Sequence, residues 1–118
     1  MSYDVSIKLP IKGAKDKWIE VAELGNITWN VRELIFQSSG WAIKNEASNG
    51  EILPWLKLIE HGIKELQNNP DKYKQYESPN GWGTVNGTLN FYRNCYDNAT
   101  EWIRYNEQLL PYAVIWVW

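Results

Sequence analysis

The sequence predicts a small α+β fold in which a short antiparallel or mixed β-sheet packs against two or three helices. Three observations predict this class: an alternating apolar pattern near the start, two central stretches with apolar residues at helical spacing, and an apolar alternating segment at the end. The 118 residues are enough to bury one hydrophobic core, so we expect a single domain spanning residues 1–118.

A β-hairpin is expected first. Apolar and polar side chains alternate over residues 3–9, which is typical of a half-buried strand. Residues 10–17 are rich in turn formers, and the alternation resumes over residues 18–24. We therefore expect two antiparallel strands joined by this turn.

The first helix is expected after the polar segment 25–30. Asn30 stands where an N-cap belongs, Glu33 follows three residues later as in a capping box, and Gly40 suits the C-terminal end. Residues 41–52 read as a loop or a short strand with an Asn-Gly turn.

Two further helices follow from the spacing of apolar residues. Pro54 suits a first turn, and apolar residues recur at helical spacing as far as Leu66. A short helix is expected over residues 70–76, with Asn69 as its cap. A longer one is expected from about Thr84 to about Tyr105.

The final segment, residues 111–118, places apolar side chains on both faces of an extended chain. This pattern is typical of a central strand that is covered on both sides or lies at an interface.

Charge and composition exclude several functional classes. The net charge is −2, and the nearest approach to a basic patch is three lysines, Lys12, Lys15 and Lys17, in the hairpin turn, so direct nucleic-acid binding is not expected. No apolar run reaches the roughly 20 residues of a membrane helix, and the first residues do not resemble a signal peptide. With one cysteine, Cys95, we expect a cytoplasmic protein without a membrane partner.

Residues suited to catalysis are few. His61 is the single histidine, and neither a zinc pattern, a nucleophile motif nor a phosphate-binding loop is present. We expect no enzymatic activity, no metal and no cofactor. The alternative is a small enzyme acting on a nucleotide or sugar through a carboxylate pair, with Asp97 and Glu101 one helical turn apart.

The aromatic content is unusual, with eight tryptophans and seven tyrosines. Trp29 and Trp82 each stand in a polar segment just before a predicted helix, where unpaired backbone N–H groups favour anions such as phosphate. Glycines let a backbone approach a ligand, and an exposed indole can stack on a base. The candidate ligand-binding residues are Asn26, Thr28, Trp29, Asn30, Asn80, Gly81, Trp82, Gly83 and Thr84. The structural alternative is that these residues only cap helices, form turns and fill the core.

The same motifs carry a resemblance to a family of small accessory proteins encoded by phages and prophages. The matching pattern is a Tyr-Asp-Val opening strand, Gly-Asn-x-Thr-x-Asn-Val over residues 25–31, Pro70 followed by Tyr73, and Asn-Gly-Trp-Gly over residues 80–83. Trp29 departs from it, since a smaller polar residue is expected there. An acidic residue is also expected where Thr84 stands. The resemblance implies a phage context, in which accessory proteins often interfere with host antiviral defences.

These observations give three functional hypotheses. The first is a non-catalytic protein that binds and sequesters a small nucleotide-like ligand. The second is a protein–protein inhibitor of a host defence enzyme such as a CRISPR effector, since Trp and Tyr are frequent interface anchors. The strand ending in Trp118 would then pair edge to edge with the partner, or with a second copy in a homodimer. The third is the enzyme on a nucleotide or sugar.

Overall fold

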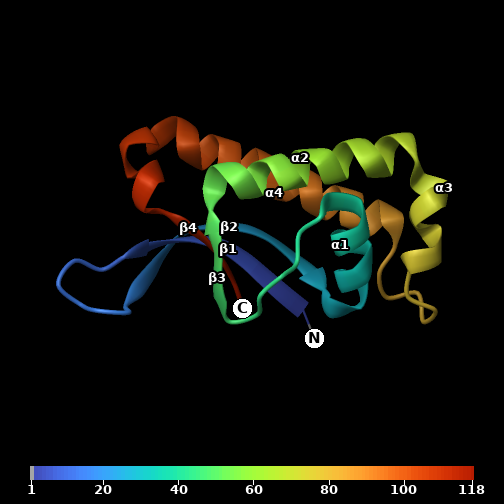
Figure 1. Cartoon of the computed structure of the whole chain (residues 1–118), viewed down its shortest axis with the longest axis horizontal. Helices are drawn as coiled ribbons and strands as arrows, with labels where there is room; N and C mark the ends of the chain where they lie inside the picture. Colours follow the sequence, from blue (N-terminus) through green and yellow to red (C-terminus); the bar gives the residue numbers. More distant parts are fainter. Residues whose placement is uncertain (1) are drawn as a thin grey trace.

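The computed structural model describes residues 2–118 and has the expected α+β class (Figure 1). Four strands form one antiparallel sheet in the order β2-β1-β4-β3. The strands are β1 (Ser2–Pro10), β2 (Trp18–Thr28), β3 (Ala47–Glu51) and β4 (Val114–Val117). The helices are α1 (Arg32–Ser39), α2 (Ile52–Asn68), α3 (Pro70–Tyr73) and α4 (Val85–Tyr105), with 3-10 turns η1 (Trp29–Val31), η2 (Lys74–Tyr76) and η3 (Glu107–Tyr112).

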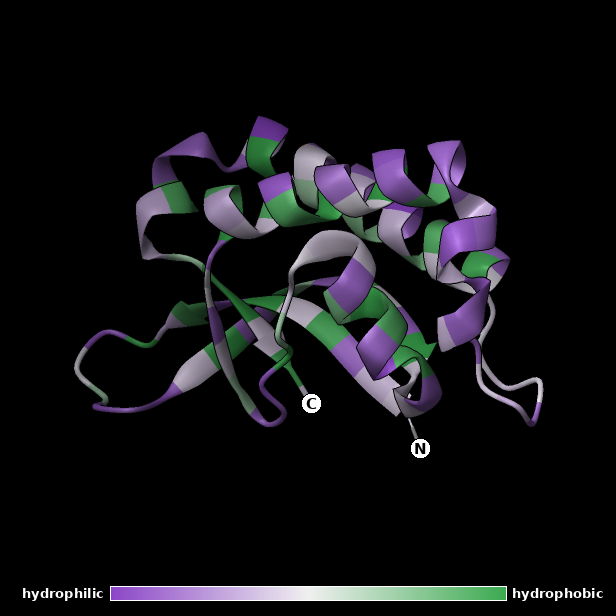
Figure 2. Cartoon of the chain, turned by 45° about the vertical axis from the view of Figure 1, so that its right-hand side comes forward, coloured by the Kyte–Doolittle hydropathy of each residue, from purple (hydrophilic) through white to green (hydrophobic). Residues whose placement is uncertain are grey.

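Helices α2 and α4 lie together on one face of the sheet, and their outward turns are mostly hydrophilic (Figures 1 and 2). The core lies between these layers. The sheet contributes alternate residues such as Val5, Ile7 and Ile115, while α2 and α4 contribute Ile59 and Tyr92. This burial follows from the period of two in the strands and the helical spacing in the helices.

The C-terminal strand is central, as its two apolar faces predict. β4 is hydrogen-bonded to β1 on one side and to β3 on the other. Both of its edges are therefore occupied, and the expected edge-to-edge pairing of this strand with a partner is wrong.

The polar segment 25–30 is not simply a loop. Strand β2 continues through two register irregularities to Thr28, so Gly25 and Asn26 pair with Val5 and Asp4 of β1. The irregularities are β-bulges, which let a strand continue through residues that are poor strand formers.

Of the four helix caps that the sequence suggests, two are formed as expected, and Asn69 stands at the N-cap position of α3 without a side-chain cap hydrogen bond. Thr84 caps α4 by accepting a hydrogen bond from the backbone N–H of Gly87 (2.9 Å), and Gly40 ends α1 in the left-handed conformation at φ 85°. Asn30, however, is not an N-cap: its own backbone N–H donates to Oγ1 of Thr28. Thr28 thus caps the turn η1, and α1 itself begins without a side-chain cap in place of the expected capping box.

The second face of the sheet is covered by tryptophan rings instead of a helix. The Nζ atom of Lys8 lies 4.3 Å from the ring centroid of Trp116 and 3.7 Å from that of Trp118. Trp18 lies 6.0 Å from Trp116, centroid to centroid. Lys8 is consequently only 6% exposed, and desolvation lowers the pKa of its amine. Strand β1 is therefore buried on both faces here, not half-buried as its alternation suggests.

Within residues 2–118, no helix combines the length and apolar character needed to cross a membrane.

Candidate functional site

Two segments that are about 50 residues apart in the sequence meet at one corner of the sheet. The end of β2 and the turn η1 approach the loop between η2 and α4, and together they line a cleft of about 520 Å³. We call it the Asn/Trp cleft; its lining residues are Ser2, Asn26, Thr28, Asn30, Asn80 and Trp82. Five of these six residues belong to the sequence-predicted set.

A second, smaller cleft of about 320 Å³ adjoins the first, sharing Asn26 and Thr28 with it. Gly81, Gly83 and Thr84 of the predicted set lie in its lining, next to the first turn of α4. Eight of the nine candidate residues therefore line one or the other of two neighbouring clefts.

Gly83 permits this close approach of the two segments. Its φ of 129° lies in a region that residues with a side chain rarely adopt, and a Cβ atom there would lie 2.4 Å from Cγ1 of the buried Val31. The same atom would lie 3.4 Å from Cγ2 of Thr28. Any larger residue at position 83 would push the two walls of the cleft apart.

The loop of the NGWG motif is organised by the side chain of Asn80. Its Oδ1 atom accepts hydrogen bonds from the backbone N–H of Trp82 (2.9 Å) and from the hydroxyl of Ser78 (2.5 Å). The backbone N–H of Ser78 in turn donates to the carbonyl of Gly83 (3.2 Å). This Asx turn leaves the Trp82 side chain 70% exposed at the rim of the cleft.

Neighbouring groups fix the orientation of the amides. Nδ2 of Asn26 donates to the carboxylate of Asp4 and to Oγ of Ser2 (3.1 Å), and Nδ2 of Asn30 donates to Oγ1 of Thr28 (3.1 Å). Because an ionised carboxylate only accepts, Oδ1 of Asn26 is left as an acceptor. In Asn80 the oxygen is engaged by the loop, so its Nδ2 group is left as a donor. The cleft thus offers a ligand both a hydrogen-bond acceptor and a hydrogen-bond donor.

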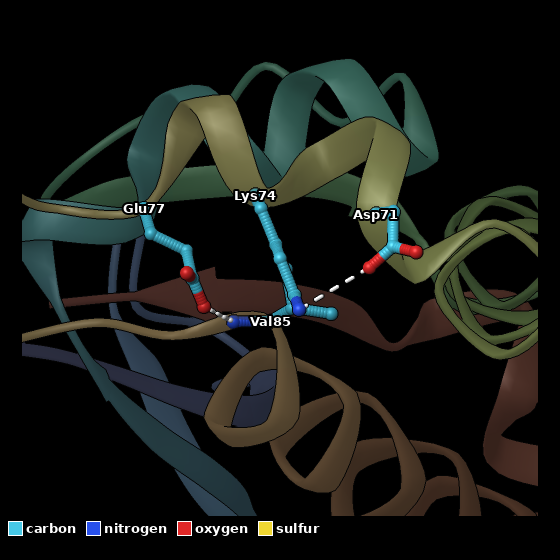
Figure 3. A network of polar contacts seen from close by, with 4 residues as sticks. All are labelled: Asp71, Lys74, Glu77 and Val85. Carbon is cyan, nitrogen blue, oxygen red and sulfur yellow. Dashed lines mark hydrogen bonds and ion pairs between the residues drawn. The ribbon is translucent and has the colours of Figure 1, made fainter.

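The start of α4 does not offer the anion site that the sequence suggests. Oε2 of Glu77 already accepts from the backbone N–H of Val85 at 2.7 Å, as Figure 3 shows, and Oγ1 of Thr84 accepts from that of Gly87. The same figure shows Lys74 paired with Asp71 (3.2 Å). A negative charge therefore occupies the position where a phosphate would bind.

Trp29 does not belong with the cleft. Its ring lies against Tyr3, with 5.8 Å between ring centroids, and it remains 37% exposed. At the junction of β2 and η1, Asn30 lies on the side of the Trp82 loop, whereas Trp29 lies against β1.

Sequence reasoning missed Ser2, Asp4 and Glu77. Glu77 precedes the residue it caps by eight positions, which lies outside the window of a capping box. Ser2 and Asp4 reach Asn26 only through strand pairing, so register, and not a local motif, identifies them.

The residues considered for catalysis lie on two helices, with His61 on α2 and with Asp97 and Glu101 one turn apart on α4. His61, Asp97 and Glu101 are exposed on the outer helices, and no cluster of three or more metal-ligating side chains occurs within residues 2–118. Cys95 is fully buried, and desolvation raises the pKa of its thiol, as for a small core residue.

No protein-family model, curated protein or solved structure matches this chain. Its function is therefore inferred from the residues of the cleft themselves.

Proposed function

We propose that this protein binds and sequesters a small nucleotide-like molecule in the Asn/Trp cleft, holding it by its base and sugar. The convergence of two motif-bearing segments around an exposed indole is the observation that supports this function most directly. Together with the resemblance to phage accessory proteins, it supports the proposal that the protein withdraws a host signal molecule.

The chemistry of the lining suits a nucleoside. Trp82 provides a π face on which any base can stack, while Asn26 supplies an acceptor and Asn80 a donor at the base edges. All six lining residues are uncharged. Base and ribose are likewise uncharged, with donors and acceptors around their edges.

The surrounding charges suit the phosphates less well. Asp4 lies behind Asn26, and Glu77 occupies the start of α4, so the fixed charges next to the clefts are negative. We therefore propose that phosphates of a bound nucleotide point to solvent and contribute little to its affinity. The proposed function includes no reaction, so the ligand is released without chemical change.

Isothermal titration calorimetry and native mass spectrometry with a panel of nucleosides and linear and cyclic nucleotides test this function. A nucleoside and its 5′-monophosphate are expected to bind with affinities within about threefold of each other, since no lining residue pairs with phosphate. Trp82→Ala is expected to weaken binding by about 5- to 150-fold, the range for losing one stacked base.

Trp29→Ala is the matched control, because it removes an indole of the same motif set that lies outside the cleft. It should leave affinity unchanged. Equal binding by wild type and Trp82→Ala, or the absence of any adduct over the whole panel, would overturn the assignment of the cleft.

A protein partner is the second candidate function, favoured by a different observation: the layer of tryptophans on the open face of the sheet. Inhibition of a host defence enzyme through that face would leave the cleft mutants fully active. Pull-down with Trp82→Ala and Trp118→Ala variants separates the two functions.

A further inference from the structure

The open face of the sheet combines tryptophan rings with carboxylates. Strand register places Glu23 and Trp116 beside Ser6, and Glu20 beside Lys8, so these side chains share the face that the helices leave uncovered. Asp4 lies on the same face two residues before Ser6, and Glu51 pairs with Val114. We call this surface the tryptophan face; its members are Trp18, Trp116, Trp118, Asp4, Glu20, Glu23 and Glu51.

The charge that this face presents to solvent is negative. All four carboxylate residues are exposed. Among the strand residues described, Lys8 is the basic one on this face, and it is 6% exposed because its ammonium group lies against the rings of Trp116 and Trp118. Its ammonium group interacts with the charge of Glu20, but one buried cation does not balance four exposed carboxylates.

The rings themselves remain accessible from the solvent side. Trp118 is 48% exposed, while Trp18 and Trp116 are partly exposed. Their centroids follow one another at 6.0 and 6.3 Å, so they form a continuous strip of indoles. The ring planes are tilted by 41° and 55° from one indole to the next, so each exposed ring offers its own face. An indole face bordered by carboxylates suits a planar cation, because a guanidinium group stacks on an indole while it donates to a carboxylate.

We propose that the tryptophan face is a docking surface for an arginine-bearing basic segment of a partner protein. Charge complementarity selects this occupant. Nucleic acid would bring phosphates against four carboxylates, and a second copy joined symmetrically through this face would bring the carboxylates of both copies together. Arginine fits better than lysine because its planar group stacks and donates at once.

This surface is separate from the proposed ligand site. The two lie on the same side of the sheet and meet at Asp4, whose carboxylate holds Asn26 of the cleft and whose carbonyl accepts from the backbone N–H of Trp118 (3.0 Å). Trp82 lines the cleft but is not part of the tryptophan face. Variants at positions 82 and 118 therefore address the two sites independently.

The test uses a fluorescein-labelled peptide of three Arg-Gly-Gly repeats, titrated with the full chain at 0.15 M salt and followed by fluorescence anisotropy. Replacing every arginine with lysine is expected to weaken binding by about threefold or more. Trp118→Ala is expected to weaken it by about two- to fivefold, whereas Trp82→Ala leaves it unchanged. Backbone amide shifts in ¹⁵N spectra locate the contact on β1 and β4.

Charge-reversal variants control for the overall charge of the protein. Glu23→Lys and Asp97→Lys change net charge equally, but Asp97 lies on the exposed side of α4. We expect about a three- to tenfold loss for the first and less than about twofold for the second. Equal losses, equal binding of both peptides, or amide shifts confined to the helices would overturn the proposal. So would concentration-dependent shifts of the face without peptide, which would identify a second copy as the occupant.

Discussion

Replacing Gly83 with alanine should separate the two segments that form the Asn/Trp cleft. The new Cβ would lie 2.4 Å from Cγ1 of Val31, which is fully buried. Backbone strain at a φ of 129° adds about 1–3 kcal/mol, and forced overpacking adds about 1–3 kcal/mol more. We expect a destabilisation of about 3 kcal/mol or more.

Gly81 provides a matched control in the same loop. Its φ is 77°, close to the left-handed region, and a Cβ there would meet nothing within 4 Å. Gly81→Ala should therefore cost about 1 kcal/mol, from backbone strain alone. The difference of about 2 kcal/mol between the two variants combines the contact with Val31 and the greater backbone strain at position 83.

Urea denaturation followed by tryptophan fluorescence, with the thermal midpoint as a second reading, provides the assay. A gap of about 2 kcal/mol corresponds to roughly 6–12 °C between the two melting temperatures. If Gly83→Ala is no less stable than Gly81→Ala, the close approach of the loop to Val31 is wrong, and the cleft between them with it.

Three further outcomes are expected. Glu77→Gln should destabilise the protein by about 1–2 kcal/mol through loss of a charged acceptor at the start of α4. It should also raise the affinity for a nucleoside monophosphate relative to that for its nucleoside. If calorimetry finds the ratio of these two affinities unchanged, Glu77 does not repel the phosphate. Thr84→Ala should cost about 1 kcal/mol in urea denaturation, whereas Asn30→Ala, which removes no cap, should cost clearly less; similar losses would mean that the capping assignment is wrong. Burial raises the pKa of Tyr92 to about 12 from its usual 10.0, so its contribution to folding stability is complete below pH 10 and is lost as the pH rises toward 12. By pH 11 the free energy of unfolding of wild type should fall by about 1.4 kcal/mol more than that of Tyr92→Phe. Parallel pH profiles of the two proteins would show that Tyr92 does not ionise differently on unfolding.

The regular elements were predictable because each is encoded by local periodicity. The hairpin, the long helix ending near Tyr105 and the central position of β4 follow from spacing and two-sided apolar character. Asn26 shows where such reasoning stops. Gly25 and Asn26 are poor strand formers, yet pairing with β1 across a bulge keeps them in β2.

Most residues that line the two clefts were predictable by type, but the charges beside them were not. Asn80, Trp82 and Gly83 stood out because they form a polar turn with an indole just before a predicted helix. That they meet Asn30 depends on the packing of the β2–η1 connection against the loop, which spacing does not encode. The Glu77 carboxylate occupies the backbone N–H of Val85, where an anion was expected, through a hydrogen bond across eight residues that no local motif predicts.

The order of strands in the sheet also has a consequence for biosynthesis. β4 lies between β1 and β3, yet it is translated about 100 residues after β1, which takes roughly 5–20 s at ribosomal rates. Until then β1 pairs with β2 alone, and one of its edges stays open beside the apolar residues that α2 and α4 will cover. A nascent chain in this state is a template for wrong strand pairing. The last strand to emerge therefore completes the sheet, and chaperone protection matters most in the seconds before it does.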